Sequence, residues 1–326
     1  MTGTPNLSVV LPVLNAEPYI GQTLRSVVAN LRPDIELIVI DDGSDDATPE
    51  IVAEAAPRLP GTRVITHEHA HGLADARNVG LAAAEGRFVT YLDGDDWLAP
   101  GYLPQLVDAI DRLGCDFVRV DHVQVEGRAR ATHWAPQGMR NTVLDPRESI
   151  LPANRRSMVD YPYAWAGVYR RSLGDLLTFP SGLRTAEDRP WIWRLHRELR
   201  SYAVVSLAGL FYRRLVTTSL TQVGDERQLD FFRAYDQVLR EVTADPQAAR
   251  FLPKATRQFV AILGHHLTLL PRYERALAAR FRARARSALA ALPPEQLAGI
   301  VVRGERAAAL RTVVPASSPL RAGLRR

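Results

Sequence analysis

The sequence predicts an α/β fold in which a mostly parallel sheet lies between helices and is followed by a helical C-terminal region. Strand-like and helix-like patterns alternate over about the first 120 residues, which is typical of repeated βα units. The run Leu37–Ile40 is continuously apolar, as expected of a strand that is covered on both faces. From about Glu226 onward, apolar residues recur at helical spacing.

The elements of the first half follow from these patterns in order. Strands are expected at Leu7–Leu11, Leu37–Ile40, Arg63–Thr66, Phe88–Leu92 and Asp116–Val120. Pro18 marks the first turn of a helix in which Ile20, Leu24 and Val27 share one face. Further helices are expected to begin at Thr48–Pro49, to cover residues 74–84, and to cover residues 103–113 before Gly114.

The second half of the chain is less regular. Residues 126–145 are polar and predict a loop or hairpin, whereas residues 163–169 and 202–212 predict strands and residues 190–199 predict a helix. We therefore expect a sheet-containing part at residues 1–225 and a basic helical part at residues 226–314. The last stretch, residues 315–326, is rich in Ser, Pro, Gly and Arg and is expected to be disordered.

Composition limits the class of protein. Of the 326 residues, 46% are hydrophobic and 24% are charged, which favours a globular chain over a disordered one. The single cysteine, Cys115, allows no intrachain disulfide and favours a reducing compartment. Neither an apolar run long enough to span a membrane nor a signal peptide pattern is visible, so a cytoplasmic location is expected.

Two acidic groups stand directly after predicted strands. Asp41-Asp42-Gly43-Ser44 follows the second strand, and Asp93-Gly94-Asp95-Asp96 follows the fourth. Ligands of open parallel sheets bind beyond the carboxyl ends of the strands, and clustered carboxylates require a cation or hydrogen-bond donors. Oxygen ligands of this kind suit Mg²⁺ or Mn²⁺. The alternative is that these residues only form turns and helix caps.

Three segments carry a resemblance to a known family. They read VVLPVLNAEPYI, IVIDDGSDDAT and HGLADARNVGLAAAEGRFVTYLDGDDW. In this order they resemble the family 2 glycosyltransferases of the GT-A fold, closely over about the first 100 residues and more loosely through AEDRPWIW and YRRLVTTSLT. The resemblance implies an inverting enzyme that transfers a sugar from a nucleoside diphosphate to a hydroxyl. It also implies a catalytic domain at residues 1–225, with a nucleotide-sugar half (1–120) and an acceptor half (121–225).

The resemblance assigns nucleotide binding to the first two strand ends. Pro12, Asn15 and Glu17 would line the nucleotide pocket. Asp42 would form a hydrogen bond with the base, and the resemblance favours uracil as that base. Asp41 would lie beside Asp42.

The resemblance assigns the phosphates, the sugar and the metal to the next segments. Arg77 would reach the nucleotide or its phosphates, and Asn78 would support that loop. Asp93 would face the ribose and the sugar. Asp95 would hold a divalent cation, Mn²⁺ or Mg²⁺, which stabilises the leaving diphosphate.

Inverting transfer also needs a carboxylate that takes the proton of the acceptor hydroxyl. Glu187-Asp188 opens a predicted helix in the second half, and the resemblance gives the role of base to Asp188. The alternative is that both acids only stabilise the helix N-terminus. Trp191 and Trp193 would either stack on a sugar or lie in the core.

Two further groups of residues, one of arginines and one of histidines, are candidates for ligand binding. Arg213 and Arg214, with Thr217-Thr218-Ser219 after them, resemble the family's closing segment, where arginines would clamp the diphosphate. A basic surface turn is the alternative. His67, His69 and His71 are expected to face solvent rather than to form a zinc site, because no suitably spaced cysteine or histidine completes one.

The charge is distributed unevenly. Residues 250–326 contain 15 basic and 3 acidic residues, which leaves 26 basic against 33 acidic residues in the remainder. Residues 272–292 read as a helix with Leu277, Phe281 and Leu289 on one side and arginines on the others. Such a helix can lie on an anionic membrane or bind an anionic acceptor. Its apolar side favours packing on the catalytic domain or on a partner subunit.

Two other functions were weighed against glycosyl transfer. A sugar nucleotidyltransferase would need a glycine-rich basic loop after the first strand, where this chain has Pro12–Asn15. A non-catalytic polyanion-binding protein would agree with the sequence pI of about 9.6, but the basic residues are confined to the tail and no nucleic-acid module is visible. The expected partners are a nucleotide sugar, a glycan, polymer or lipid-linked acceptor, and a second copy of the chain, with no nucleic acid.

Overall fold

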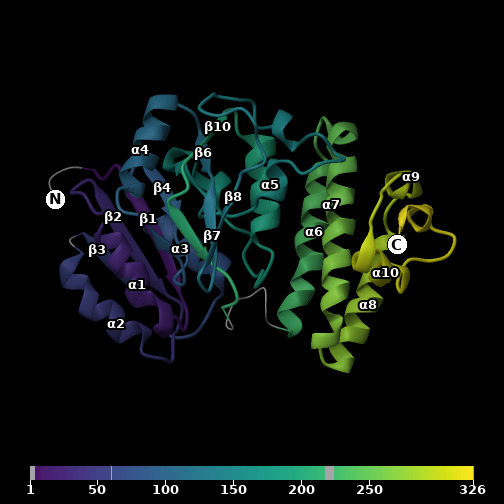
Figure 1. Cartoon of the computed structure of the whole chain (residues 1–326), viewed down its shortest axis with the longest axis horizontal. Helices are drawn as coiled ribbons and strands as arrows, with labels where there is room; N and C mark the ends of the chain where they lie inside the picture. Colours follow the sequence, from purple (N-terminus) through teal and green to yellow (C-terminus); the bar gives the residue numbers. More distant parts are fainter. Residues whose placement is uncertain (1–3, 60, 217–223, 326) are drawn as a thin grey trace.

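The computed structural model describes residues 4–59, 61–216 and 224–325. A seven-stranded sheet, mostly parallel, forms its centre (Figure 1). In spatial order its strands are β10 (Tyr202–Val205), β6 (Phe117–Val120), β9 (Gly167–Arg170), β4 (Phe88–Tyr91), β1 (Leu7–Val13), β2 (Ile35–Asp41) and β3 (Thr62–Thr66). β9 runs antiparallel to both of its neighbours. The predicted α/β class with a mostly parallel sheet is confirmed.

The middle of this sheet is fully covered. All seven residues of β1 and all seven of β2 are buried, which agrees with their mostly apolar sequences. The hydroxyl of Ser8 in β1 donates to Glu36 of β2 at 2.5 Å, so these two buried polar side chains pair with each other. In the parallel ladder Val13 lies opposite Asp41, and Val10 lies opposite Tyr91. The carboxyl ends of β1, β2 and β4 therefore meet at one edge of the sheet.

The helices of the first half agree with their predicted positions. They are α1 (Glu17–Val28), α2 (Thr48–Ala55), α3 (Leu73–Ala83) and α4 (Tyr102–Leu113). α4 is bounded by Gly101 and Gly114, both with left-handed backbone, and it buries Leu103, Leu106 and Ile110 on one side. This is the amphipathic pattern that the sequence carries.

A second sheet lies beside the first. Its strands are, in order, β5 (Trp97–Leu98), β11 (Leu210–Arg213), β7 (His122–Glu126) and β8 (Ala129–His133). The expected hairpin is present, but it begins at His122 rather than at residue 126. The single strand predicted at residues 202–212 is wrong, because β10 and β11 belong to different sheets. Between them lies Gly209, where a Cβ would stand only 2.3 Å from the Tyr102 ring.

The remaining strand and helix of residues 121–225 are shifted slightly from their predicted positions. The strand predicted at residues 163–169 is present only as β9, because residues 161–165 leave the sheet and join a cluster of aromatic rings. The predicted helix is α5 (Asp188–Glu198), which begins two residues earlier than expected.

Helices fill the C-terminal region, as predicted. They are α6 (Asp230–Thr243), α7 (Ala248–Leu269), α8 (Arg275–Ala290), α9 (Pro294–Leu297) and α10 (Gly304–Arg311). Figure 1 shows this group standing beside α5, at the end of the molecule remote from β3. The indole of Trp193 in α5 donates to Gln258 of α7 at 2.8 Å. The apolar side of α8 packs within the chain, with Phe281 buried against Phe232 at 4.8 Å between centroids.

The end of the chain differs from expectation. Residues 315–326 were expected to be disordered, but a short 3₁₀ helix spans Pro319–Gly323. Leu320 and Leu324 are buried, and the backbone of Leu324 pairs with Val302. These two leucines make apolar contacts that hold the segment in place. The composition of the segment, rich in Ser, Pro, Gly and Arg, does not reveal such contacts.

No helix within the described residues combines the length and the apolar character that crossing a membrane requires.

The close packing of α3 on the sheet leaves no room for a side chain at Gly80. A Cβ at Gly80 would stand 2.3 Å from Val10 Cγ1 and 2.7 Å from Ile40 Cδ1. Gly80→Ala is therefore expected to lower the free energy of unfolding by about 1–3 kcal/mol through overpacking. Alanine would otherwise be favoured over glycine in a helix by about 1 kcal/mol. Thermal or urea unfolding measures the change.

Gly21 of α1 is the matched control. Its Cβ would meet only Arg25 Nη1 at 3.4 Å and Ile51 Cγ2 at 3.9 Å. Gly21→Ala is expected to raise the unfolding midpoint. If Gly80→Ala were as stable as Gly21→Ala, close approach would not be the reason for glycine at position 80.

Candidate active site

The two acidic groups predicted from the sequence flank the end of β1. The amide of Asp42 donates to Val13 O at 2.9 Å, and the amide of Leu92 donates to Val10 O at 3.0 Å. A Cβ on Gly94 would lie 3.0 Å from Val13 Cγ1. The loops after β2 and β4 therefore border the same end of β1, as the sequence predicts.

The loop after β1 is tied to the loop after β2. Asn15 has a φ of +50°. Its amide donates to Ser44 Oγ at 3.0 Å, and its Oδ1 accepts from the amide of Asp45 at 2.9 Å. Pro12 is buried within β1, whereas Glu17 is exposed at the start of α1. Of these three predicted nucleotide contacts, Asn15 and Glu17 reach the surface of the loop.

The carboxylate of Asp42 organises the segment before α3. Its Oδ1 accepts from the amide of His71 at 2.9 Å and lies 2.7 Å from His67 Nδ1, while its Oδ2 accepts from the amide of Gly72 at 2.7 Å. Asp41 is also buried, and its Oδ1 accepts from the amide of Ser44 at 3.1 Å. Asp41 therefore has fewer protein partners than Asp42.

The expectation that the three histidines face solvent is wrong for His67. Its side chain is only 13% exposed and contacts Asp42, while His69 and His71 are exposed. His67 directly follows β3, which pairs with β2. Strand pairing therefore places it beside Asp42, a relation that local sequence does not reveal.

Arg77 joins the two halves of the catalytic part. Its Nη2 donates to Asp93 Oδ1 at 2.8 Å, and its Nη1 donates to Glu187 Oε1 at 2.9 Å. The Arg77 side chain is 4% exposed. Burial opposes its charge, but the two carboxylates outweigh burial and raise the pKa of Arg77. Arg77 therefore bridges two carboxylates, and its contact with the nucleotide or its phosphates stays a prediction.

The side chain of Asn78 binds the backbone of Phe179, in the segment before α5. Its Nδ2 donates to Phe179 O at 2.9 Å, and its Oδ1 accepts from the amide of Phe179 at 2.7 Å. The Phe179 ring in turn lies under Arg77, with 5.2 Å between the guanidinium carbon and the ring centroid. Neighbouring residues of α3 therefore fix both a side chain and a backbone segment of the acceptor half.

The carboxylates after β4 repel one another. Burial and the charge of Asp93 raise the pKa of Asp95 to about 6. Burial and both neighbouring acids raise the pKa of Asp96 well above its usual range. Asp96 Oδ1 accepts from the amide of Arg213 at 2.8 Å. Its Oδ2 is buried and has no hydrogen-bond partner among the described residues.

Arg213 stabilises this loop rather than facing a ligand. Its Nε donates to Asp95 O at 2.9 Å, and its guanidinium lies over the rings of Tyr19 and Trp97, at 4.9 and 4.6 Å from their centroids. Arg214 is partly exposed, and the diphosphate clamp stays a prediction. Thr217-Thr218-Ser219 lie outside the described residues.

Glu187 and Asp188 stand at the first turn of α5, after Ala186 with a left-handed φ of +60°. Burial raises the pKa of Glu187 to about 7, and the charge of Asp188 raises it while Arg77 lowers it. Burial also raises the pKa of Asp188, against Arg189 and Arg77. Asp188 remains 26% exposed, with Oδ1 3.6 Å from Arg189 Nε. It is therefore accessible to a substrate, whereas Glu187 is enclosed.

Trp191 and Trp193 lie in the core and do not reach a sugar. Both are fully buried. The indole of Trp191 donates to Leu177 O at 2.8 Å. This decides between the two alternatives that the sequence left open.

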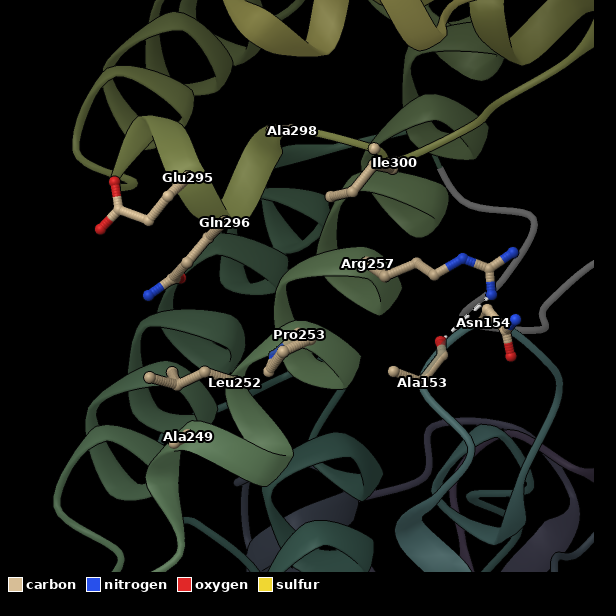
Figure 2. Close-up of a pocket in the computed structure, with 11 residues that line it drawn as sticks. Ala153, Asn154, Ala249, Leu252, Pro253, Arg257, Glu295, Gln296, Ala298 and Ile300 are labelled. Atoms are coloured by element: carbon tan, nitrogen blue, oxygen red, sulfur yellow. Dashed lines mark hydrogen bonds between the residues drawn. The ribbon is translucent and has the colours of Figure 1, made fainter.

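A separate pocket of about 580 Å³ lies in the C-terminal region, between α7 and residues 295–300 (Figure 2). Small apolar groups line much of it, and Arg257 crosses it to donate to Ala153 O at 3.2 Å. It contains none of the carboxylates described above.

Comparison with known proteins identifies the family. Residues 8–176 match the family described as glycosyl transferase family 2, which is slightly over half of the chain. The chain belongs to glycosyl transferase family 2. It is 30% identical over 236 residues to the uncharacterized glycosyltransferase EpsJ of Bacillus subtilis, which covers 69% of this chain and 66% of EpsJ.

A second relative is the poly(ribitol-phosphate) beta-N-acetylglucosaminyltransferase TarS of Staphylococcus aureus. It is 28% identical over 209 residues, or 63% of this chain and 35% of TarS. The crystal structure of TarS residues 1–349 in complex with UDP-GlcNAc matches with a TM-score of 0.72 at 23% identity, over 90% of this chain and 83% of that one. This likeness establishes the GT-A fold. The chain spans about two thirds of the length of EpsJ and about one third of TarS.

The coupled acids of α5 allow a direct test of the site. The Glu187 carboxyl is expected to titrate near pH 7, with its pKa raised to about 7 by burial and by Asp188. Asp188→Asn removes a negative charge beside it and should lower that pKa. NMR of ¹³C-carboxyl-labelled glutamate measures both values, and Glu187→Gln identifies the resonance.

Asp111→Asn is the control substitution, because this exposed aspartate lies on α4 and pairs with Arg87. It should leave the Glu187 resonance and its pKa unaltered. A Glu187 pKa that is ordinary, or that rises in Asp188→Asn, would contradict the coupling of the two acids.

Proposed function

We propose that this protein is an inverting glycosyltransferase that moves a sugar from a nucleoside diphosphate to a hydroxyl of a glycan or cell-envelope polymer. One observation carries the proposal. Arg77 contacts Asp93 at the donor edge and Glu187 next to Asp188 on the acceptor side. A carboxylate for the donor and a carboxylate for the acceptor therefore border one site.

The donor is proposed to be a UDP-sugar, and UDP-GlcNAc is the first to test. The TarS complex with UDP-GlcNAc supports this choice. In this proposal Asn15, Glu17 and Asp41 face the nucleotide, with Pro12 below them. Asp42 acts mainly by fixing the loop before α3, since three donors already surround it. Asp93 would meet the ribose and sugar.

Asp95 is proposed to hold a divalent cation, Mn²⁺ or Mg²⁺. The residues fit such an ion, because the pKa of Asp95 is raised by burial and by Asp93, and Asp96 Oδ2 lacks a partner among the described residues. The described residues contain no group of three or more typical ligands, so phosphate oxygens and water would complete the coordination. When bound, the cation would neutralise the charge of the leaving diphosphate.

Asp188 is proposed to be the general base. Its carboxylate takes the proton of the acceptor hydroxyl while that oxygen bonds to the anomeric carbon. The bond from this carbon to the diphosphate breaks on the opposite side, and the electron pair leaves with the nucleoside diphosphate. Attack from the side opposite the leaving group inverts the configuration. The partial exposure of Asp188, 26%, supports access for the acceptor.

The basic face of α8 is proposed to meet an anionic membrane surface. Arg275, Arg282 and Arg286 are exposed and recur at a spacing that places them along one stripe of the helix. Arg280 is paired with Glu226, and Arg284 lies over the ring of Phe232. The stripe has the charge of a helix that lies on anionic lipid.

Two substitutions separate the proposed roles of the acids. Asp188→Asn should still bind UDP-GlcNAc but lose transfer by about 10²–10⁴-fold, as expected when a general base is removed. Asp95→Asn should lose the response of binding to Mn²⁺, because a metal ligand is removed. Calorimetry with UDP-GlcNAc, with and without Mn²⁺, is combined with an assay of UDP release.

Asp111→Asn is the control, since this aspartate is exposed on α4 and pairs only with Arg87. It should leave binding and transfer unaltered. Normal turnover in Asp188→Asn would remove that residue from the reaction, and an unaltered Mn²⁺ response in Asp95→Asn would refute the metal assignment.

Membrane contact is tested with vesicles. The chain should sediment with vesicles that contain phosphatidylglycerol and not with neutral ones, and 0.5 M salt should release it, because exposed charges are screened. The double variant Arg282→Gln, Arg286→Gln should bind more weakly than a double variant of exposed arginines far from α8, Arg58→Gln with Arg112→Gln. Equal binding of the two double variants would refute the role of α8.

A further inference from the structure

A continuous cluster of aromatic rings lies on the acceptor side. Tyr163 stacks on Trp165 at 4.8 Å between centroids, and the Tyr212 ring lies 5.1 Å from Trp165 and 6.0 Å from Tyr163. His122 lies 4.9 Å from Tyr163 and 4.8 Å from both Trp165 and His133. Trp165 and His122 are buried, whereas Tyr163, Tyr212 and His133 are partly exposed. The exposed rings thus form a surface supported by buried ones.

Guanidinium groups border this surface. Arg156 Nη2 lies 2.5 Å from His133 Nε2. Arg214 Nη1 lies 3.3 Å from the Tyr212 hydroxyl, with its guanidinium carbon 5.5 Å from the ring centroid. Among the described residues, neither arginine has a carboxylate partner within ion-pair distance. Two cations at one edge of an aromatic surface are therefore without an anion from the protein.

The proposed base lies at the same surface. Burial raises the pKa of the Tyr163 hydroxyl, the charges of Arg189 and Arg156 lower it, and Asp188 raises it. These charges act on Tyr163 because they are near it. Arg189 adds a third guanidinium, 23% exposed and 3.6 Å from Asp188. Asp188 and Arg189 are therefore among the charged groups that surround Tyr163.

We propose that this surface is an acceptor subsite for a sugar or polyol that carries a phosphate group next to the reacting hydroxyl. The inference rests on the proposed function and names its acceptor class. The rings of Tyr163 and Tyr212 offer an apolar face to the carbon–hydrogen face of a sugar. The planar forks of Arg156, Arg189 and Arg214 match phosphate oxygens. A neutral glycan would leave Arg156 and Arg214 without a counter-ion, whereas Arg189 already lies 3.6 Å from Asp188.

The position of these arginines separates them from the donor. Arg213, which precedes Arg214, is held between Tyr19 and Trp97 at the donor loop. Arg156 and Arg189 belong to the acceptor half, and Arg156 contacts β8 through His133. Burial lowers the pKa of His133, and the charges of Arg156 and Arg214 lower it further. Arg156 and Arg214 therefore both lie near His133, at the edge of the aromatic surface.

The test uses two probes that differ by one phosphate. Calorimetry compares glucose with glucose 6-phosphate on the full chain saturated with UDP and Mn²⁺, so that the donor site is occupied. Glucose 6-phosphate is expected to bind roughly tenfold more tightly or better, as a charge-assisted hydrogen bond allows. Arg156→Gln should remove most of this difference, and Tyr163→Leu should weaken both probes.

Arg58→Gln, at an exposed site after α2, is the matched control and should not alter either affinity. Equal binding of the two probes, binding of neither at millimolar concentration, or an unaltered difference in Arg156→Gln would overturn the inference. A chain that fails to bind UDP would instead contradict the proposed function. The two failures are therefore distinguishable within one titration.

The source of the phosphate is separated by a second comparison. A soluble poly(glycerol phosphate) chain and vesicles that carry a polyprenyl phosphate are offered as acceptors with UDP-GlcNAc, against unphosphorylated maltotriose. Transfer to the polymer assigns the phosphate to the acceptor chain, and transfer only at the vesicles assigns it to a lipid carrier. Preferred transfer to maltotriose would overturn the phosphate requirement.

Discussion

The arrangement of the site depends on the buried guanidinium of Arg77. Removing a charge from water costs several kcal/mol, and carboxylate partners offset that cost only when the geometry is good. Arg77 obtains one partner, Asp93, from the end of β4 and the other, Glu187, from the start of α5. Losing one partner of a buried pair costs about 3–5 kcal/mol. The contact that joins the halves therefore also sets the position of Asp188 relative to the donor edge.

The sequence predicts the fold well where local pattern decides it. β1 and β2 are buried along their whole length and α4 on one side, so their periods are unambiguous. Prediction fails where distant packing decides. The chain leaves one sheet after β10 and enters the other at β11, where Gly209 lies against the ring of Tyr102. The C-terminal segment is ordered because Leu320 and Leu324 find a buried place, although its composition favours disorder.

In the site, as in the fold, the sequence predicts what local motifs define and not what distant contacts decide. The motifs give the acids at the ends of β2 and β4, because short spacing and strand position mark them. The motifs do not identify the distant side chains with which the site residues interact. Arg77 meets Glu187 across 110 residues, Arg213 meets Gln22 across 191, and His67 meets Asp42 through strand pairing. Each contact adds a structural role that the sequence does not reveal: Arg77 bridges two carboxylates, Arg213 supports the loop after β4, and His67 supports Asp42.

The proposed acceptor surface is another feature that distant contacts decide. Its rings and arginines come from β7, β8, β11, α5 and the segment before β9, so no short motif describes it, whereas the donor edge is built from compact motifs. Chains that share the donor motifs can therefore differ in acceptor without altering them. Residues 1–249 carry 26 basic against 33 acidic residues, a balance that repels an anionic acceptor over most of the body. The arginines around Tyr163 reverse that potential locally, and a field of this shape orients a charged substrate before contact.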